Sequence, residues 1–158
     1  MFKLSETIDV TVPPQVAFDW VADVENLTRW QSGVFASKLL TPPPAKVGTR
    51  FTEALKVMGL KLTSTCEVTE LVAPKTYAFV ARGSQMNYTS RFDFAAAPGG
   101  GTRMTLQASI TMRGFWKLME PMVRAEGSKE TKEELRRLKA AMESDNASRP
   151  PLKVAASR

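Results

Sequence analysis

The residues that could do chemistry in this chain are few, because its 158 residues include no histidine and a single cysteine, Cys66. Histidine is the usual general base near neutral pH and a common ligand of zinc and copper. One cysteine cannot form an internal disulfide. We therefore expect no metal site and no cofactor, and any acid–base chemistry must come from carboxylates, lysines or tyrosines.

Two carboxylates occupy positions that a half-buried strand would turn inward. Glu6 alternates in phase with Leu4 and Ile8, and Glu53 lies in phase with Leu55. An unpaired charge in such a place is costly or becomes neutral through a raised pKa. Each carboxylate is therefore expected to have a partner or a function.

The partners that the sequence offers are Arg82 and Arg91, although a one-residue slip in strand phase reverses the face of each. A structural ion pair or a solvated strand end explains the two carboxylates as well as a functional site does. No catalytic residue is assigned. If the protein is an enzyme, Glu6 and Tyr88 are the candidates.

Methionine and aromatic side chains recur at positions that the strand and helix patterns turn inward. Thioethers form a deformable apolar surface, and a buried tyrosine hydroxyl needs a hydrogen-bond partner that a ligand could provide. The same side chains also serve as ordinary core packing, so both interpretations stay open. The candidate ligand-binding residues are these side chains together with Leu55 and Arg91, namely Leu55, Met58, Tyr77, Phe79, Tyr88, Arg91, Phe92, Met104, Met119 and Met122.

The elements that must position these residues follow a simple order. Residues 2–12 alternate like a strand, Pro14 fits the first turn of a short helix, and Asp23 is a candidate cap for a second. Extended segments separated by hairpin-sized gaps follow, at residues 34–40, 49–58, 60–72, 75–82, 86–96 and 102–113.

Residues 115–143 carry the one long helical pattern, in which Pro121 is expected to kink the first turns. Beyond it the pattern fades into a polar segment. The sequence predicts one domain over residues 1–143 and a disordered tail over residues 144–158. The apolar stripe of the helix comprises Leu118, Met119, Met122, Val123, Leu135, Leu138 and Met142.

In this order the elements resemble the START-like superfamily, also called the Bet v 1-like or SRPBCC group, which includes polyketide cyclases/dehydrases and lipid transport proteins. The resemblance is carried by residues 12–20, 23–30, 47–50, 100–106 and 135–139. It implies an α+β helix-grip fold, with a curved seven-stranded antiparallel sheet around a long C-terminal helix and two short helices after the first strand. In that family the second short helix often borders the pocket mouth, which implies a ligand contact for Trp30.

The composition argues against several partners. The net charge of +6 is spread along the chain without a basic stripe and interleaved aromatics, so nucleic acid is not expected. No apolar run is long enough for a membrane span or a signal peptide. We expect a soluble, cytoplasmic protein whose partner is a small hydrophobic molecule, without integral membrane association. The oligomeric state does not follow from these features.

Three functions fit the sequence, because a curved sheet closed by one helix leaves a void unless large side chains fill it. The first is a non-catalytic binding or carrier protein for a small hydrophobic molecule, lipid-like or polyketide-like. The second is an enzyme of the polyketide cyclase or aromatase type, which would act largely by orienting its substrate. The third is a protein-interaction module in which side chains fill the cavity.

Overall fold

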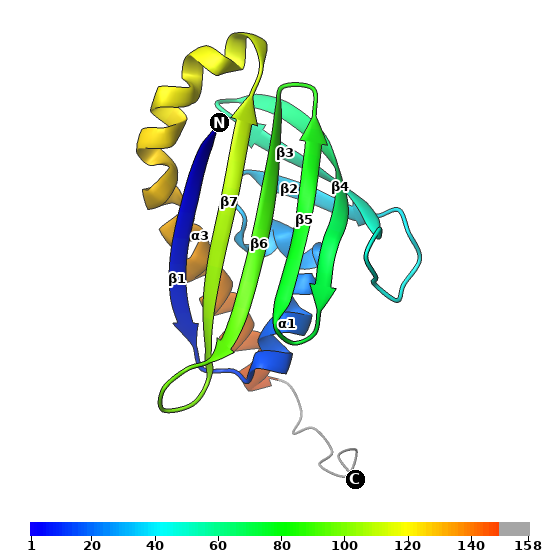
Figure 1. The fold of residues 1–158 in the computed structure, drawn as a ribbon, viewed down its shortest axis with the longest axis vertical. Helices are drawn as coiled ribbons and strands as arrows, with labels where there is room; N and C mark the ends of the chain where they lie inside the picture. The colour runs from blue at the N-terminus through cyan, green and yellow to red at the C-terminus, as the bar shows by residue number, and fades with distance from the viewer. Residues whose placement is uncertain (149–158) are drawn as a thin grey trace.

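A seven-stranded antiparallel sheet grips one long helix in the computed structural model, which describes residues 1–148 (Figure 1). The strand order is β1-β7-β6-β5-β4-β3-β2, so β2 to β7 are consecutive neighbours and β1 pairs with β7. This confirms the predicted helix-grip fold. The strands are β1 Phe2–Val10, β2 Val34–Leu39, β3 Arg50–Val57, β4 Leu60–Val72, β5 Thr76–Gly83, β6 Met86–Ala96 and β7 Thr102–Met112.

Short helices follow the first strand, as predicted. The helix α1 spans Pro14–Ala22 and begins with a proline, whose missing N–H is not needed in the first turn. A 3-10 turn η1, Val24–Asn26, leads into α2, Leu27–Trp30. The Asp23 carboxylate caps η1 by accepting a 3.1 Å hydrogen bond from the Glu25 N–H.

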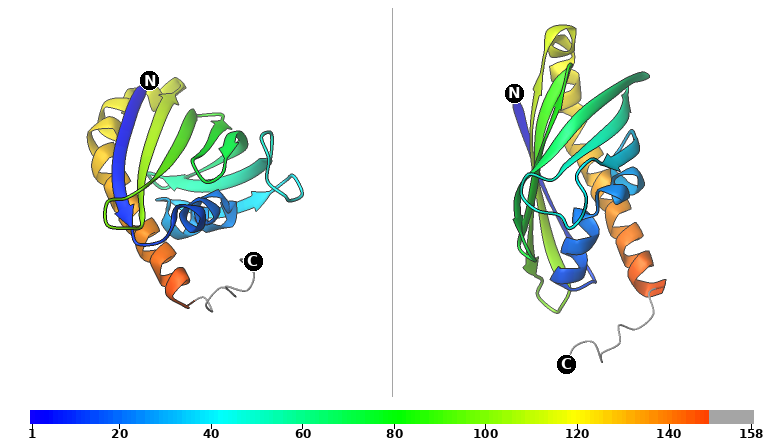
Figure 2. Two further views of the ribbon diagram at one scale, coloured as in Figure 1. Left: turned by 60° about the horizontal axis from the view of Figure 1, so that its bottom comes forward. Right: turned by 90° about the vertical axis from the view of Figure 1, so that its right-hand side faces the viewer.

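Two strands bend the sheet because each carries an extra residue. The register shifts between Val34 and Ala36 of β2, and again between Val68 and Glu70 of β4. Such bulges increase the local twist and bend the strand. Both α1 and α3 lie on the concave side of the resulting sheet (Figure 2).

The long helix α3 spans Glu120–Ser148 and follows a 3-10 segment η2, Gly114–Met119. The sequence predicted one helix from residue 115. Proline lacks an N–H and its ring clashes with the carbonyl four residues back, so Pro121 is accommodated in the first turn of a helix that starts at Glu120. Further along, Gly127 faces Leu4 of β1, and an added Cβ would lie 3.1 Å from the Leu4 side chain. Glycine thus lets α3 approach the sheet edge.

The helix α3 continues past Glu143, where the sequence predicted its end. The helix continues to Ser148, and the Asp145 carboxylate accepts hydrogen bonds from Trp20 Nε1 at 2.9 Å and from Arg29 at 2.5 and 2.8 Å. These contacts tie the last turns of α3 to α1 and α2. The rest of the predicted tail, residues 149–158, lies outside the described residues.

Aromatic rings fill the concave face where α1 and the C-terminal half of α3 cover it. The rings of Phe51 and Phe79 lie 5.3 Å apart between centroids, and those of Phe18 and Phe94 lie 5.5 Å apart. We call this region the filled end. The same core cluster includes Leu135, Leu138 and Met142 from α3.

Candidate functional site: an acidic apolar cavity

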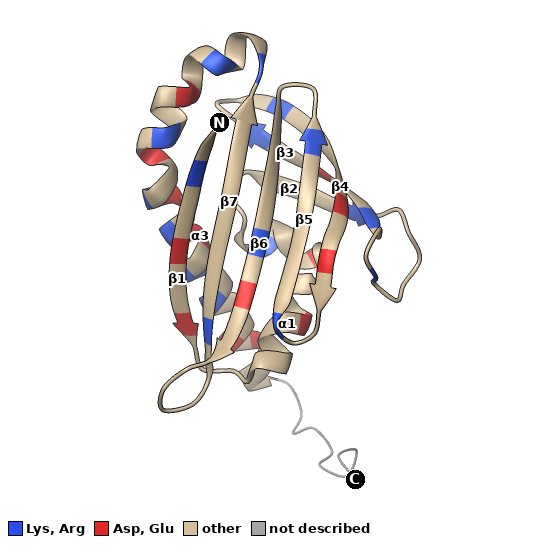
Figure 3. Ribbon diagram, in the orientation of Figure 1, with Lys and Arg blue, Asp and Glu red and all other residues tan. Residues whose placement is uncertain are grey.

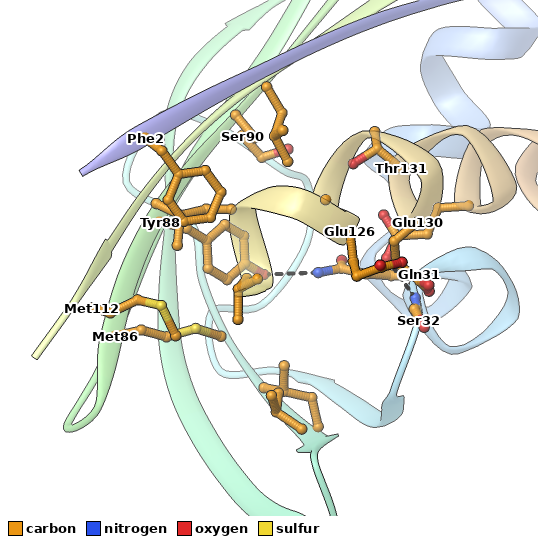
Figure 4. A pocket seen from close by; sticks show the side chains of 18 of the residues that line it. Phe2, Gln31, Ser32, Met86, Tyr88, Ser90, Met112, Glu126, Glu130 and Thr131 are labelled. Carbon is orange, nitrogen blue, oxygen red and sulfur yellow. Dashed lines mark hydrogen bonds between the residues drawn. The ribbon is translucent and has the colours of Figure 1, made fainter. Parts of the chain in front are cut away.

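A cavity of about 480 Å³ opens between the other end of the sheet and the N-terminal half of α3 (Figure 4). This volume lies within the range of ligand pockets in proteins. We call this region the hollow end. It is lined by Phe2, Leu4, Trp30, Gln31, Ser32, Leu55, Val57, Met58, Met86, Tyr88, Ser90, Leu106, Ala108, Ile110, Met112, Met122, Val123, Glu126, Gly127, Glu130, Thr131 and Glu134.

Single strands contribute to both ends of the molecule. On β6, Tyr88 and Ser90 line the cavity, whereas Phe92 and Phe94 pack in the filled end. On β7, Met112 lines the cavity and Met104 is fully buried away from it. Alternation places all of these side chains on the concave face, and position along the strand decides which end they reach.

The mouth of the cavity is partly apolar. Met58 and Met122 line the cavity and are nevertheless 58% and 45% exposed. Met58 occupies the two-residue turn between β3 and β4 with φ of 53°, followed by Gly59 with φ of 81°. Positive φ at both positions matches a type I′ hairpin turn, in which glycine, asparagine or aspartate is the usual choice. Methionine at the first position therefore accepts backbone strain at the mouth.

A hydrogen-bonded chain of polar groups crosses the cavity wall. The Tyr88 hydroxyl donates to Glu53 Oε1 at 2.5 Å, and Gln31 Nε2 donates to the Tyr88 oxygen at 3.2 Å. Glu53 is 1% exposed, and burial raises its pKa to about 7, an effect that the Tyr88 hydrogen bond partly offsets. Burial also raises the pKa of Tyr88 well above its usual range, so Tyr88 keeps its proton.

Three buried atoms beside these hydrogen bonds have no hydrogen-bond partner within residues 1–148: Trp30 Nε1, Gln31 Oε1 and Glu53 Oε2. Trp30 and Gln31 line the cavity directly, and Glu53 points from the same face of β3 as Leu55, which also lines it. Buried polar atoms are normally paired. An unpaired set at a cavity wall is suited to contact a polar group of a ligand.

The helix wall of the cavity carries three carboxylates at four-residue intervals, Glu126, Glu130 and Glu134. Glu134 Oε1 accepts a 2.9 Å hydrogen bond from the Ser32 N–H. Burial raises the pKa of Glu134 to about 7, and the nearby charges of Glu130 and Glu53 add to the rise. Glu130 has Arg137 Nη2 at 3.7 Å.

Several residues predicted from the sequence come together in the cavity wall, namely Trp30, Leu55, Met58, Tyr88 and Met122. Others lie away from it. The four residues Tyr77, Phe79, Phe92 and Met104 are buried in the core but do not line the cavity. The half-buried Met119 ends η2 and is not among the lining residues either.

Arg91 lies away from the cavity, and neither Glu6 nor Glu53 has the arginine partner that the sequence suggested. The Arg91 guanidinium donates hydrogen bonds to Glu70 at 2.6 Å and to Asp93 at 3.0 Å. Arg91 therefore lies on the outer face of the sheet, whereas Glu53 lies on the concave face. The Glu6 carboxylate faces α3, where it accepts a 2.5 Å hydrogen bond from the Ser128 hydroxyl. Neither residue lines the cavity, and the partner of Glu53 is Tyr88 rather than an arginine.

Sequence reasoning missed the polar part of the cavity, Gln31, Ser32 and the three glutamates of α3. A signal was present, because residues 122, 126, 130 and 134 lie on one helix face at four-residue spacing. The three glutamates follow Met122 on that face, so the face that points to the cavity changes from apolar to acidic along the helix. Glutamates on a charged helix resemble an ordinary solvated face, which hid the pattern.

The curved sheet, the gripping helix and the cavity between them define a protein of the helix-grip class. The chain belongs to the polyketide cyclase/dehydrase and lipid transport family, whose sequence profile matches residues 1–143. This match confirms the START-like resemblance of the sequence. No curated protein matches the chain in sequence.

Solved structures share the fold at low sequence identity. The protein TTHA0849 from Thermus thermophilus is similar with a TM-score of 0.77 and 19% identity, covering 94% of this chain and all (100%) of that one. The Zhui aromatase/cyclase from Streptomyces sp. R1128 has a TM-score of 0.73 and 13% identity, with 90% and 93% covered. A START superfamily protein from Mycobacterium smegmatis has a TM-score of 0.72 and 16% identity, with 90% and 97% covered.

The outer surface carries charges of both signs. Basic and acidic residues are interspersed over the sheet face and along α3 in Figure 3, without a continuous basic stripe on the side shown. Within residues 1–148, no helix is both long and apolar enough to cross a membrane. The cytoplasmic location stays a prediction.

Proposed function

We propose that this protein binds a small, largely apolar molecule in the cavity of the hollow end and acts as a binding or carrier protein rather than an enzyme. The observation that carries the proposal is the open cavity of about 480 Å³, walled by methionine, leucine and aromatic side chains. Apolar wall that faces water in an open space of this kind is unfavourable, at about 25 cal/mol per Å². A ligand that fills it offsets this cost.

The experiment compares two substitutions on neighbouring residues of β7. Ala108 lines the cavity, whereas Gln107 is exposed on the opposite face. Ala108→Phe places a ring in the cavity, and we expect it to weaken binding of the neutral apolar dye Nile red by about tenfold or more. Gln107→Phe adds the same ring outside and should leave dye affinity unchanged. Equal affinity in the two variants, measured by fluorescence titration with folding checked by circular dichroism, would reject the cavity as the binding site.

A second candidate is an enzyme of the aromatase/cyclase type, and the Tyr88–Glu53 pair favours it. Glu53 has a pKa of about 7, so its carboxyl can both give and take a proton at neutral pH. Tyr88, which is hydrogen-bonded to Glu53, lines the cavity. Tyr88→Phe removes the hydroxyl at the cavity wall. If the wild type cyclises a linear poly-β-ketone probe and Tyr88→Phe abolishes turnover while Nile red still binds, the enzymatic function replaces the carrier function.

The third function, a protein-interaction module with a filled interior, is disfavoured by the same cavity. The concave face of the hollow end is not occupied by side chains, because about 480 Å³ remains open there. The proposal therefore rests on a bound small molecule.

A further inference from the structure

The charged residues in the cavity wall all have one sign. Glu126, Glu130 and Glu134 line the cavity, and no lysine or arginine is among the lining residues within the described part of the chain. This is unexpected in a protein with a net charge of +6. Figure 4 shows Glu126 and Glu130 beside Gln31 and Ser32, whereas Met86 and Met112 lie at the other side of the space. The cavity thus has an acidic side and an apolar side.

The negative charge on this wall is only partly compensated. Arg137 approaches Glu130 at 3.7 Å, but its Nε donates to the Trp30 carbonyl oxygen at 3.1 Å. Glu134 receives one backbone hydrogen bond, from Ser32. The carboxyls of Glu130 and Glu53 lie near enough to Glu134 to raise its pKa. Glu126 and Glu130 are solvent-exposed, the Glu130 side chain by 51%, whereas Glu134 is partly buried. Carboxylates grouped on one side of a cavity attract cations even where water partly screens them.

Unpaired buried acceptors point to the same kind of ligand. The Tyr88 proton is committed to Glu53 Oε1, so Tyr88 accepts from Gln31 Nε2, and this fixes Gln31 Oε1 as an acceptor without a protein partner. Glu53 Oε2, in a side chain that is 1% exposed, is also unpaired, and it is an acceptor at a pH above the Glu53 pKa of about 7, where the carboxyl is ionised. A ligand with N–H donors would satisfy such acceptors, whereas a carboxylate or phosphate would add more acceptors and like charge.

The remaining unpaired atom and the aromatic walls are compatible with a cationic ligand. Trp30 Nε1 is a donor, which an ether or hydroxyl oxygen of the same ligand would satisfy. Trp30, Tyr88 and Phe2 line the cavity, and aromatic faces attract ammonium groups. A metal ion fits less well, because within residues 1–148 no three acidic or cysteine side chains converge closely enough to hold one.

We propose that the cavity selects an apolar molecule that carries a protonated amine, with its hydrocarbon part against the methionines and its ammonium group beside Glu130, Glu134 and the Gln31 amide oxygen. This inference rests on the proposed binding function and names the chemical class of the ligand. The carboxylates reject anionic amphiphiles such as fatty acids by like charge.

The test compares three probes of equal chain length, decylamine, decan-1-ol and decanoate, in displacement of Nile red from the full chain at pH 8 and low salt. We expect decylamine to bind about tenfold or more tightly than decanoate, with decan-1-ol between them. Glu130→Gln combined with Glu134→Gln should weaken decylamine by about fivefold or more and leave decan-1-ol within about twofold. The control Glu133→Gln, which pairs with Arg136 outside the cavity, should change neither.

Each outcome decides one statement. If decanoate binds as tightly as decylamine while decan-1-ol also binds, the cavity function stands and the selection for a cation is overturned. If none of the three probes displaces the dye, this inference is overturned, and the proposed function falls with it only if Ala108→Phe and Gln107→Phe also bind the dye equally. If the double variant prefers decylamine over decanoate as strongly as the wild type does, Glu130 and Glu134 are not the residues that bind the ammonium group. Should the double variant not fold in a thermal melt, the two single variants answer the same question.

Discussion

At the end of the sheet that carries α1, aromatic rings and the last turns of α3 fill the concave face, whereas at the other end the same strands enclose a cavity of about 480 Å³. The two ends differ in what α3 brings to them. Its C-terminal half contributes Leu135, Leu138 and Met142, all at most 2% exposed. Its N-terminal half contributes Gly127, Thr131 and glutamates, and only Met122 and Val123 as larger apolar side chains. Large apolar side chains make a core, and small or charged ones leave a space.

This difference indicates that one end of each long strand contributes to the stability of the fold, whereas the other end forms the binding cavity. The filled end carries the close packing that holds the fold, so the hollow end can hold strained, charged and unpaired groups. Substitutions of the same kind should therefore have different effects at the two ends.

The largest effect is expected from identical truncations of leucine. Leu138→Ala removes a fully buried side chain of the filled end and should lower the free energy of unfolding by about 4 kcal/mol. Leu55→Ala, in the cavity wall, should cost only about 2 kcal/mol, because one side of that leucine has no packing partners to lose. Urea unfolding measures both. Equal costs would show that the hollow end is as closely packed as the filled end.

The pH dependence of stability should report the buried carboxyl of the hollow end. The Glu53 pKa has an ordinary value of 4.5 and is about 7 in the folded protein. Because the folded state holds this proton more tightly, the free energy of unfolding falls as pH rises from about 4.5 to about 7, by about 3 kcal/mol for this group. Glu53→Gln cannot titrate, so its stability should fall less over that range.

The other groups around Glu53 define the control for this measurement. Tyr88 from β6 and Cys66 from β4 have raised pKa values and stay protonated over this range, and Gln31 does not titrate. Glu134 from α3 titrates near pH 7 in both proteins, with Glu130 and Arg137 beside it, so its part of the slope remains. Parallel curves for Glu53→Gln and the wild type would contradict the buried, protonated state of Glu53.

A smaller effect is expected where the filled end is closed by the last turns of α3. Asp145→Ala removes the acceptor of Trp20 Nε1 and the ion-pair partner of the half-exposed Arg29, and should cost about 1 kcal/mol. Asn146→Ala, at an exposed neighbouring position, is the control. If the two variants melt at the same temperature, the domain boundary near residue 143 predicted from the sequence is adequate.

Much of the fold was predictable because alternation, hairpin gaps and prolines are local signals. The seven strands, the helix that begins at Pro14 and the Asp23 cap all follow from residues close in sequence. The limits of α3 were not predictable to the same degree. Its start depends on the accommodation of Pro121, and its end depends on contacts of Asp145 with α1 and α2, which are distant in sequence.

The candidate site was predictable only in part, for a physical reason. Alternation gives the face of a side chain but not whether the space opposite it is filled. Phe92 and Tyr88 share the concave face of β6, yet Phe92 packs against Trp30 at 5.7 Å between ring centroids, whereas the Tyr88 hydroxyl joins the polar chain of the cavity. That distinction depends on how far α3 lies from the sheet, which no local pattern encodes.

The smallest effect should come from Met58, where strain and binding meet at the cavity mouth. Met58→Asn replaces a residue held at a φ of 53° with one that tolerates this conformation, and should raise the free energy of unfolding by about 0.5 kcal/mol. The same change removes an exposed thioether from the mouth, so the affinity for Nile red should fall by about twofold to fivefold. Urea unfolding and dye titration on one sample measure both. A gain in stability without a loss of affinity would mean that Met58 is only a turn residue, whereas opposite changes would show that the hollow end gives up stability for binding.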